Sequence, residues 1–283
     1  MKKILVIGLS GESVFLQVDR LVNDGQTLTS PPRHVEPGGK GYNQAIALGA
    51  LGADVEFITT FGTTYREECQ RTLIDNKVNI LEVTKDAKGS YAVIIVDKEG
   101  NNKVIVDGGA SALVTYEDII KYQKQIDKAD IILLQLEYNQ EAIKKVIDYA
   151  YEKGKMIILN PAPKCTLDKE TLAKVTYLTP NEYEVTLLPD VKTKIIITLG
   201  SKGVCFNDFG KEKYYEAYKT KALDTTGAGD IFNAAFAFAK SIDYQDEEAI
   251  KFAICASSYK VERQGIINAL PTYDDVKKRL GRK

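Results

Sequence analysis

The chain has 283 residues, of which 44% are hydrophobic and 27% are charged, the composition of a globular protein long enough to bury a core. Its 38 lysines and arginines nearly balance its 39 aspartates and glutamates, so no basic excess draws it to nucleic acid or to an anionic membrane. The chain has one histidine and four scattered cysteines, which argues against a zinc site and predicts a cytoplasmic protein with reduced thiols. It has no apolar run near the ~20 residues that a membrane span needs.

Short apolar runs alternate along the chain with amphipathic segments of helical length. The apolar runs are typical of strands buried on both faces of a sheet, and they lie at Ile4–Ile7, Val55–Thr59, Ile131–Leu134, Met156–Leu159 and Lys194–Thr198. The amphipathic segments lie at Gly41–Leu51, Tyr116–Lys128, Gln140–Lys153, Ile231–Lys240 and Glu247–Val261. This alternation predicts an α/β fold, a mainly parallel sheet flanked by helices, which binds its ligands at the carboxyl ends of the strands.

Two stretches interrupt that alternation and are typical of strands without helices. Val14–Val18 alternates, and Tyr91–Val96 and Lys103–Val106 form a predicted hairpin around a Lys98–Asn102 turn. Such strands, inserted into an α/β domain, predict a small antiparallel β-sheet that projects as a lid. We therefore expect a lid made of residues 11–37 and 88–108, and an α/β nucleotide- and substrate-binding domain made of residues 1–10, 38–87 and 109–283.

A glycine-rich turn, Gly38-Gly39-Lys40-Gly41, runs directly into the first predicted helix. Its glycines allow the backbone to approach a ligand closely, and Lys40 and Asn43 add donors suited to hydroxyl groups. Glu137 follows the strand predicted at 131–134, where a carboxylate can accept hydrogen bonds from a polyol. Taken alone, the turn is equally well a connecting loop, and Glu137 a cap of the next helix.

Two further segments at strand ends have the residue types of a nucleotide site. Asn181 and Glu184 are three residues apart, so in a helical turn they share a face and can orient the water shell of Mg²⁺, although the same spacing describes a helix cap. Residues 198–204, Thr-Leu-Gly-Ser-Lys-Gly-Val, end a buried strand in a tight turn whose hydroxyl and amide groups suit a phosphate or a ribose. As a hairpin turn, this segment needs no ligand.

Residues 224–230, Asp-Thr-Thr-Gly-Ala-Gly-Asp, precede an alanine-rich helix. The N–H groups of Gly227, Ala228 and Gly229, together with the dipole of that helix, make a site suited to an anion such as phosphate. A carboxylate at Asp230, beside such a site, suits a general base that removes the proton of a hydroxyl attacking the phosphate. The alternative is a glycine-rich turn with an aspartate cap.

In their order and spacing, these motifs resemble those of the ribokinase-like (PfkB-type) carbohydrate kinase family over nearly the whole chain. The resemblance rests on seven segments: Gly-Gly-Lys-Gly-x-Asn-Gln-Ala at 38–45, Leu-Gly-Ala at 51–53, Gln-Leu-Glu at 135–137, Asn-Pro-Ala-Pro at 160–163, Thr-Pro-Asn-Glu-x-Glu at 179–184, Thr-Leu-Gly-Ser-Lys-Gly-Val at 198–204 and Asp-Thr-Thr-Gly-Ala-Gly-Asp at 224–230. It implies an ATP-dependent kinase that phosphorylates a hydroxyl of a small sugar, ribose or a related pentose or hexose, beneath a β-sheet lid.

The resemblance also implies a role for each candidate residue. Asp230 matches the catalytic base, and the anion hole is matched by Gly227, Ala228 and Gly229. Sugar contacts are matched by Gly39, Lys40, Asn43 and Glu137. The ATP site is matched by Asn181, Glu184, Thr198, Gly200, Ser201 and Gly203, with Glu184 holding Mg²⁺ through water. Asp224 and Thr226 resemble ligands of an activating potassium ion, K⁺, whose shell is completed by backbone groups near Arg263–Gly265. Lid strands often pair between subunits in this family, which implies a homodimer.

The chain departs from the family pattern at several positions, among them two that bear on the sugar and the monovalent ion. The early Asn-x-Asp pair that binds the sugar falls on Gly11-Glu12-Ser13, so Ser13 stands where an aspartate would bind two ring hydroxyls. Ala269 replaces a serine that can serve the monovalent ion. Because of Ser13, a nucleoside or pseudouridine kinase of the same family stays as an alternative to the sugar kinase. A non-catalytic sugar-binding protein is a second alternative, from a different class.

Overall fold

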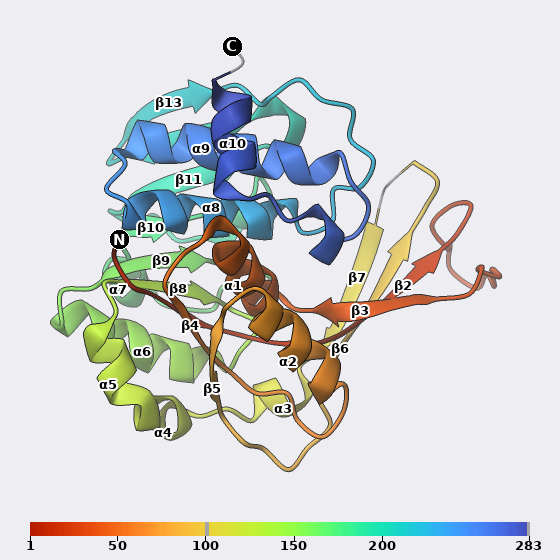
Figure 1. Ribbon diagram of the computed structural model, residues 1–283, viewed down its shortest axis with the longest axis horizontal. Coiled ribbons are helices and arrows are strands. Elements are labelled where there is room, and N and C mark those ends of the chain that lie inside the picture. The colour runs from red at the N-terminus through yellow and green to blue at the C-terminus, as the bar shows by residue number, and fades with distance from the viewer. Residues whose placement is uncertain (100–101, 282–283) are drawn as a thin grey trace.

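Within residues 1–99 and 102–281, which the computed structural model describes, the chain folds around a nine-stranded sheet of order β13-β12-β11-β10-β9-β8-β1-β4-β5 (Figure 1). Its strands are β1 (Ile4–Ile7), β4 (Val55–Thr59), β5 (Asn79–Glu82), β8 (Ile131–Gln135), β9 (Met156–Asn160), β10 (Tyr177–Leu178), β11 (Lys194–Thr198), β12 (Val204–Asp208) and β13 (Lys211–Tyr215). The pairings from β5 to β11 are parallel, whereas β12 and β13 form an antiparallel edge. The strand order reverses beside β1, and ligands of open α/β sheets bind at such a reversal.

Helices cover both faces of this sheet because its parallel strands are apolar on both sides. Ile4 and Val6 of β1 belong to one core, which they share with the helices α1 (Lys40–Leu51), α2 (Arg66–Asp75), α8 (Ala228–Ser241), α9 (Asp246–Val261) and α10 (Tyr273–Leu280). Leu5 and Ile7 belong to the opposite core, which they share with α4 (Tyr116–Ile119), α5 (Gln123–Lys128), α6 (Gln140–Glu152) and α7 (Lys169–Leu172). The short elements are α3 (Gly109–Ala112) and the 3-10 turns η1 (Ile120–Tyr122), η2 (Glu184–Leu187), η3 (Gly200–Lys202) and η4 (Ile267–Ala269).

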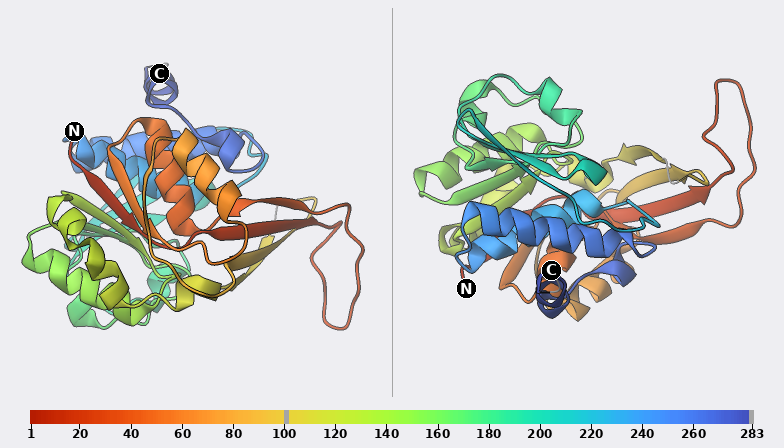
Figure 2. Two further views of the ribbon diagram at one scale, coloured as in Figure 1. Left: turned by 60° about the horizontal axis from the view of Figure 1, so that its bottom comes forward. Right: turned by 90° about the horizontal axis from the view of Figure 1, so that it is seen from above.

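A second sheet projects from this α/β core, as Figure 2 shows, and forms the lid. Its strands are β2 (Gly11–Gln17), β3 (His34–Gly38), β6 (Ser90–Val96) and β7 (Asn102–Asp107), in the order β3-β2-β6-β7. The predicted antiparallel lid is confirmed for two of its three pairings, β2 with β3 and β6 with β7, whereas β2 and β6 pair in parallel. The chain leaves the core twice in the same direction, along β2 and along β6, and returns through β3 and β7. Part of the predicted turn between β6 and β7, at 100–101, lies outside the described residues.

The predicted fold class, a mainly parallel α/β sheet with a small β-sheet lid, is confirmed. The predicted strands at 4–7, 55–59 and 194–198 have the same bounds in the structure, whereas the helix predicted at 116–128 is broken by η1. His34–Gly38, which overlaps a predicted turn, is a strand. The division of the chain into two domains stays a prediction. None of the helices described by the structure is long and apolar enough to cross a membrane.

Candidate active site

A cavity of about 820 Å³ opens at the carboxyl ends of the parallel strands, between the α/β core and the lid. Within the described part of the chain, its wall includes all the candidate site residues but one: Ser13, Gly39, Lys40, Asn43, Glu137, Asn181, Glu184, Thr198, Gly200, Ser201, Gly203, Thr226, Gly227, Ala228, Gly229 and Asp230. The exception is Asp224, which is not part of the wall. The structure therefore gathers, around one cavity, segments as far apart in the sequence as Ser13 and Asp230.

The N-terminus of α8 faces this cavity. The residue before the helix, Gly227, has a φ of 72°, and a Cβ there would come within 2.8 Å of Ile266 Cδ1, so a larger residue would displace the turn. The N–H of Ala228, one of three predicted anion donors, donates to the Thr225 carbonyl at 3.2 Å and is engaged within the turn. The dipole of α8 still favours an anion at this place.

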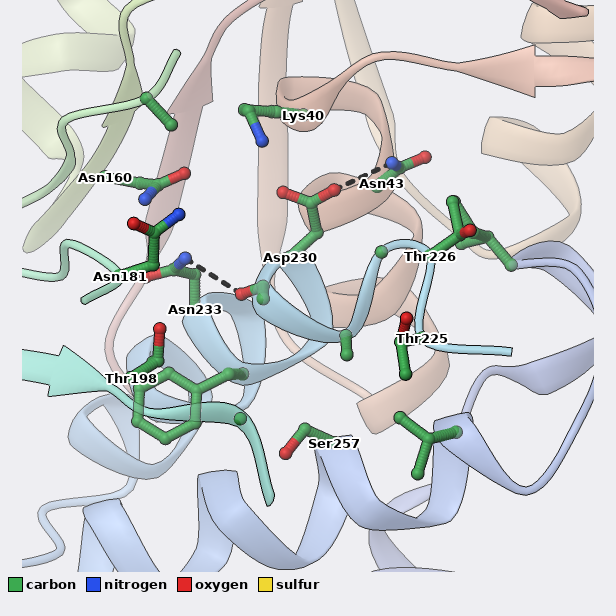
Figure 3. A pocket seen from close by; sticks show the side chains of 18 of the residues that line it. Lys40, Asn43, Asn160, Asn181, Thr198, Thr225, Thr226, Asp230, Asn233 and Ser257 are labelled. Atoms are coloured by element: carbon green, nitrogen blue, oxygen red, sulfur yellow. Dashed lines mark hydrogen bonds between the residues drawn. The ribbon is translucent and has the colours of Figure 1, made fainter. Parts of the chain in front are cut away.

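Asp230 lies in the first turn of α8 with only 6% of its surface exposed. Asn43 Nδ2 donates to its Oδ2 at 2.8 Å (Figure 3). Gln44 Nε2 donates to Asp230 Oδ1 at 3.1 Å. Gln44 is itself fixed, because Gln135 Nε2 donates to its Oε1 at 2.5 Å. The carboxylate is thus oriented jointly by α1 and α8, through neutral amides that add no positive charge.

The N-terminus of α1 forms the next part of the wall. Gly39 has a φ of 104°, and a Cβ there would lie 2.4 Å from Leu9 Cδ2, so this turn also requires glycine. The turn directs the backbone N–H of Lys40 to Glu137 Oε2 at 2.7 Å. Asn43 Oδ1 is buried and has no hydrogen-bond partner among the described residues, which suits it to a ligand hydroxyl.

The side chain of Lys40 is surrounded by carboxylates. Burial alone would lower the pKa of Lys40, but the charges of Asp230, Glu137 and Glu184 outweigh that effect and raise it. Burial raises the pKa of Glu137, and Lys40 opposes that rise. Figure 3 shows the amino group of Lys40 directed toward Asp230. An ammonium at this place can stabilise negative charge that develops on a phosphoryl group.

Asn181 and Glu184 form the reciprocal hydrogen bonds of a capping box, the alternative that the sequence left open, at the start of the 3-10 turn η2. Asn181 Oδ1 accepts the N–H of Glu184 at 2.8 Å, and Glu184 Oε2 accepts the N–H of Asn181 at 2.9 Å. Both residues nevertheless line the cavity, and a backbone bridge joins Asn181 to Thr198. Among the described residues, no cluster of three or more acidic, histidine or cysteine side chains offers a metal cage. One carboxylate beside phosphates does fit Mg²⁺, which keeps several waters in nucleotide sites.

The lid contributes the roof of the cavity. Ser13 is buried, and the register places it opposite Glu36 of β3 and beside Ala92 of β6. The other lid residues in the wall are mainly apolar: Phe15, Ala92, Ile94, Asn102, Val104 and Val106. At position 13 the lid therefore offers a ligand one hydroxyl in place of a carboxylate.

Asp224, predicted with Thr226 to hold a monovalent cation, is paired with a lysine. The backbone N–H groups of Thr226 and Gly265 donate to its carboxylate, each at 2.9 Å. Lys260 Nζ donates to the Asp224 carbonyl at 2.8 Å and lies 3.3 Å from Asp224 Oδ2. Burial would raise the pKa of Asp224, but these donors and the charge of Lys260 outweigh burial and lower it. The group therefore fits a carboxylate neutralised by lysine better than a carboxylate that coordinates a metal ion.

Among the residues at or beside the site that carried no prediction are Gln44, Asn233 and Lys260. Gln44 lies within the recognised segment at 38–45, next to Asn43. Asn233 donates to the Gly229 carbonyl at 2.9 Å, and it is the only polar residue between Ile231 and Ala239. An isolated polar residue in an apolar helix is a signal by which the sequence could have identified Asn233. Lys260, at the end of α9, carries a similar but weaker signal.

Comparisons with known proteins agree with this geometry. Residues 1–273 match the model of the pfkB family of carbohydrate kinases. A ribokinase of Bacillus subtilis is 34% identical over 294 residues, which cover 99% of this chain and all of the relative. The crystal structure of the Thermotoga maritima ribokinase has a TM-score of 0.87 and 30% identity over the whole of both chains. The structure of the Arabidopsis thaliana ribokinase complexed with ribose and ATP has a TM-score of 0.86 and 26% identity, and the match covers 100% of this chain and 99% of that one.

The fold and the site together define a class of protein, a phosphotransferase whose cavity lies between an α/β core and a β-sheet lid. The match over residues 1–273 and the similarity to the Bacillus subtilis relative identify a family within that class. The chain belongs to the pfkB family of carbohydrate kinases. The prediction of an ATP-dependent kinase with an alcohol group as acceptor is thereby confirmed.

Proposed function

We propose that this kinase transfers the γ-phosphoryl group of ATP to a hydroxyl of ribose or of a related pentose or hexose, with Asp230 as the general base. One observation carries the proposal: the Asp230 carboxylate is buried at the N-terminus of α8, oriented by Asn43 and Gln44, and borders the cavity beneath the lid. The similarity to ribokinases supports ribose as the first acceptor to test.

The charges around Asp230 account for the transfer step. Asp230 accepts the proton of the sugar hydroxyl while the hydroxyl oxygen bonds to the γ-phosphorus, and the bond from that phosphorus to the β,γ-bridging oxygen breaks to release ADP. Negative charge on the transferred group is stabilised by the N-terminus of α8 at Gly227–Gly229 and by the Lys40 ammonium. Removing a general base of this kind costs roughly 10²–10⁴-fold in rate.

We assign ATP to the wall of the cavity farther from the lid. The assigned residues are Asn181, Glu184, Thr198, Gly200, Ser201 and Gly203. The backbone bridge from Asn181 to Thr198 supports this grouping, since it joins two of these segments. Bound Mg²⁺ would neutralise phosphate oxygens, and Glu184 would hold it through water.

We assign the sugar to Gly39, Lys40, Asn43, Glu137 and Ser13. Asn43 Oδ1 and the Glu137 carboxylate supply acceptors for hydroxyls, and Ser13 adds a hydroxyl from the lid. A second acceptor class, a nucleoside such as pseudouridine, is favoured by one observation: Phe15 and Ile94 beside Ser13 make a surface on which a base can stack. A sugar-binding protein without turnover is the remaining alternative.

We further propose a cytoplasmic enzyme that forms a homodimer through its lid. The four cysteines form no disulfide within the described residues, which agrees with a reducing compartment. The edge strand β7 is exposed along its length, with Val104 and Ile105 51% and 70% exposed. An apolar, exposed edge strand suits pairing with a second copy, which light scattering would reveal as twice the chain mass.

The proposed function is tested by release of ADP, coupled to a spectrophotometric readout, across pentoses, hexoses and nucleosides with ATP and Mg²⁺. We expect turnover with ribose or a related sugar, and Asp230→Asn to lower kcat by about 10²–10⁴-fold without loss of folding. Asparagine keeps the shape of the side chain but does not accept the proton.

The matched control is Asp75→Asn, which removes an exposed carboxylate at the end of α2 and should leave kcat unchanged. Normal turnover by Asp230→Asn would rule out its assignment as the base. Binding of a sugar without turnover, for every compound, would favour the non-catalytic alternative. Preference for a nucleoside over all free sugars would select the second acceptor class.

A further inference from the structure

Lys260, near the C-terminus of α9, has no exposed surface. A buried ammonium is costly unless it is paired and hydrogen-bonded. Its Nζ donates to the backbone carbonyl of Asp224 and lies 3.3 Å from the carboxylate of the same residue. The ammonium of Lys260 thus contacts a carbonyl oxygen and a carboxylate oxygen of Asp224. A hard monovalent cation such as potassium would bind the same two kinds of oxygen.

We propose that the Lys260 ammonium takes the place of a monovalent metal cation beside the turn at 224–227, so that this kinase works without potassium. The family resemblance implies a cation held by Asp224 and Thr226. In this chain the positive charge is supplied by a side chain, because the Lys260 ammonium contacts the Asp224 oxygens that such an ion would need. The measurements of kcat that test this proposal rest on the proposed function, whereas the measurements of Tm do not.

The place of Lys260 explains how it acts on the active site without touching a substrate. The Asp224 carboxylate accepts the N–H groups of Thr226 and Gly265, and so ties the turn before α8 to the loop after α9. Ile266, in that loop, packs against Gly227. Lys260 neutralises the carboxylate at the centre of this arrangement and is therefore a positioning residue for the N-terminus of α8.

A second carboxylate faces the same group from the lid. Glu36 of β3 is buried, and a Cβ added at Gly265 would lie 3.4 Å from Glu36 Oε2, so Glu36 borders the loop that Asp224 ties down. Burial lowers the pKa of Lys260, and the charges of Asp224 and Glu36 oppose that lowering. The ammonium thus lies near a carboxylate of the core and a carboxylate of the lid.

The first experiment uses the unmodified protein in KCl, NaCl and choline chloride at equal ionic strength. We expect kcat to differ by less than about twofold between the salts, and Tm by less than about 1 °C. An increase in kcat of about tenfold or more that is specific to K⁺ would overturn the proposal, since it would show a working ion site beside the lysine.

The second experiment removes the charge with Lys260→Met. We expect kcat in NaCl to fall about tenfold or more, and K⁺ to restore most of it and to raise Tm by about 2 °C over NaCl, because the ion then binds the exposed Asp224 oxygens. The readout in Tm needs no turnover, so a failed sugar screen would leave this arm intact. Undiminished kcat of Lys260→Met in choline chloride would contradict the proposal.

The matched control is Lys240→Met. Lys240 is 11% exposed and paired with Asp246 at the far end of α8, outside the cavity wall, so its loss should lower Tm without creating a response to K⁺. A response to K⁺ in both variants would overturn the proposal, since the effect would then be general. If Lys260→Met does not fold, Lys260→Gln replaces it, because an amide can still donate to the Asp224 carbonyl.

Discussion

The carboxylate of Glu137 shows how one residue can give the reaction a pH dependence. Burial raises the pKa of Glu137 above its ordinary value near 4.5, and the charge and N–H of Lys40 only partly oppose this. A protonated carboxyl is a weaker acceptor for sugar hydroxyls than a carboxylate. Sugar affinity should therefore be complete well above the raised pKa and should decline as the pH falls through it.

Glu137→Gln tests this expectation. We expect KM for the sugar to rise roughly 10–100-fold at neutral pH, because hydrogen bonds to a charged group contribute about 1.5–3 kcal/mol. The variant should also lose the acidic rise of KM, since glutamine does not titrate. The measurement is KM for the sugar between about pH 5 and 8, with KM for ATP as the internal control. A variant with an unchanged pH profile would show that another group sets it.

At the residue scale, the sequence predicted which residues gather at one cavity better than how each of them is paired. Asp230, Lys40 and Asn43 were placed at one site because their residue types and their glycine-rich surroundings have few other uses. Asp224 was predicted to hold a monovalent cation, and its pairing with Lys260 of α9, over thirty residues later in the chain, was not predicted. A long-range pair of this kind leaves no local pattern in the sequence.

The position of the N-terminus of α8 depends on the glycine that precedes it, Gly227. Gly227 has a φ of 72° and packs against Ile266, so alanine there would strain the backbone and displace the turn that carries the anion donors. We expect Gly227→Ala to lower stability by about 1–3 kcal/mol and kcat by about tenfold or more, measured by thermal unfolding and by ADP release.

The control for Gly227→Ala is Gly210→Ala, in the turn between β12 and β13. Gly210 has a φ of 94°, and a Cβ there would meet nothing within 4 Å, so alanine adds backbone strain without a clash. It should lower stability by a similar amount and leave kcat unchanged. Equal loss of kcat in both variants would show that the effect comes from stability alone.

At the scale of elements, the accuracy of the predictions follows from burial. Strands such as β1 and β4 are buried throughout and mainly apolar, so both of their ends were visible in the sequence. The strand β3 was missed because His34–Gly38 contains a proline and a glycine and overlaps a turn motif. The parallel pairing of β2 with β6 was also missed, because register between distant strands depends on the path of the chain through the core.

At the scale of the whole molecule, the lid and the core differ in how firmly they are held. The core strands β1 and β8 are fully buried, whereas β7 is exposed along its whole length and pairs only with β6 among the described strands. The inner face of the lid borders the cavity through Phe15, Ile94 and Val104. A sheet with so little support should open more readily than the core.

Hydrogen exchange should resolve this difference. In the protein without ligands, we expect amides of β6 and β7 to exchange at least about 10²-fold faster than those of β1 and β8. The inactive Asp230→Asn variant allows sugar and ATP to be present together without turnover. Because the assigned sugar contacts include Ser13 of the lid, the sugar should slow exchange in β2 and β6, whereas ATP alone should leave the lid unchanged. Lid amides that are as protected as the core before any ligand is added would show a rigid roof, and the acceptor would then have to enter a site that is already closed.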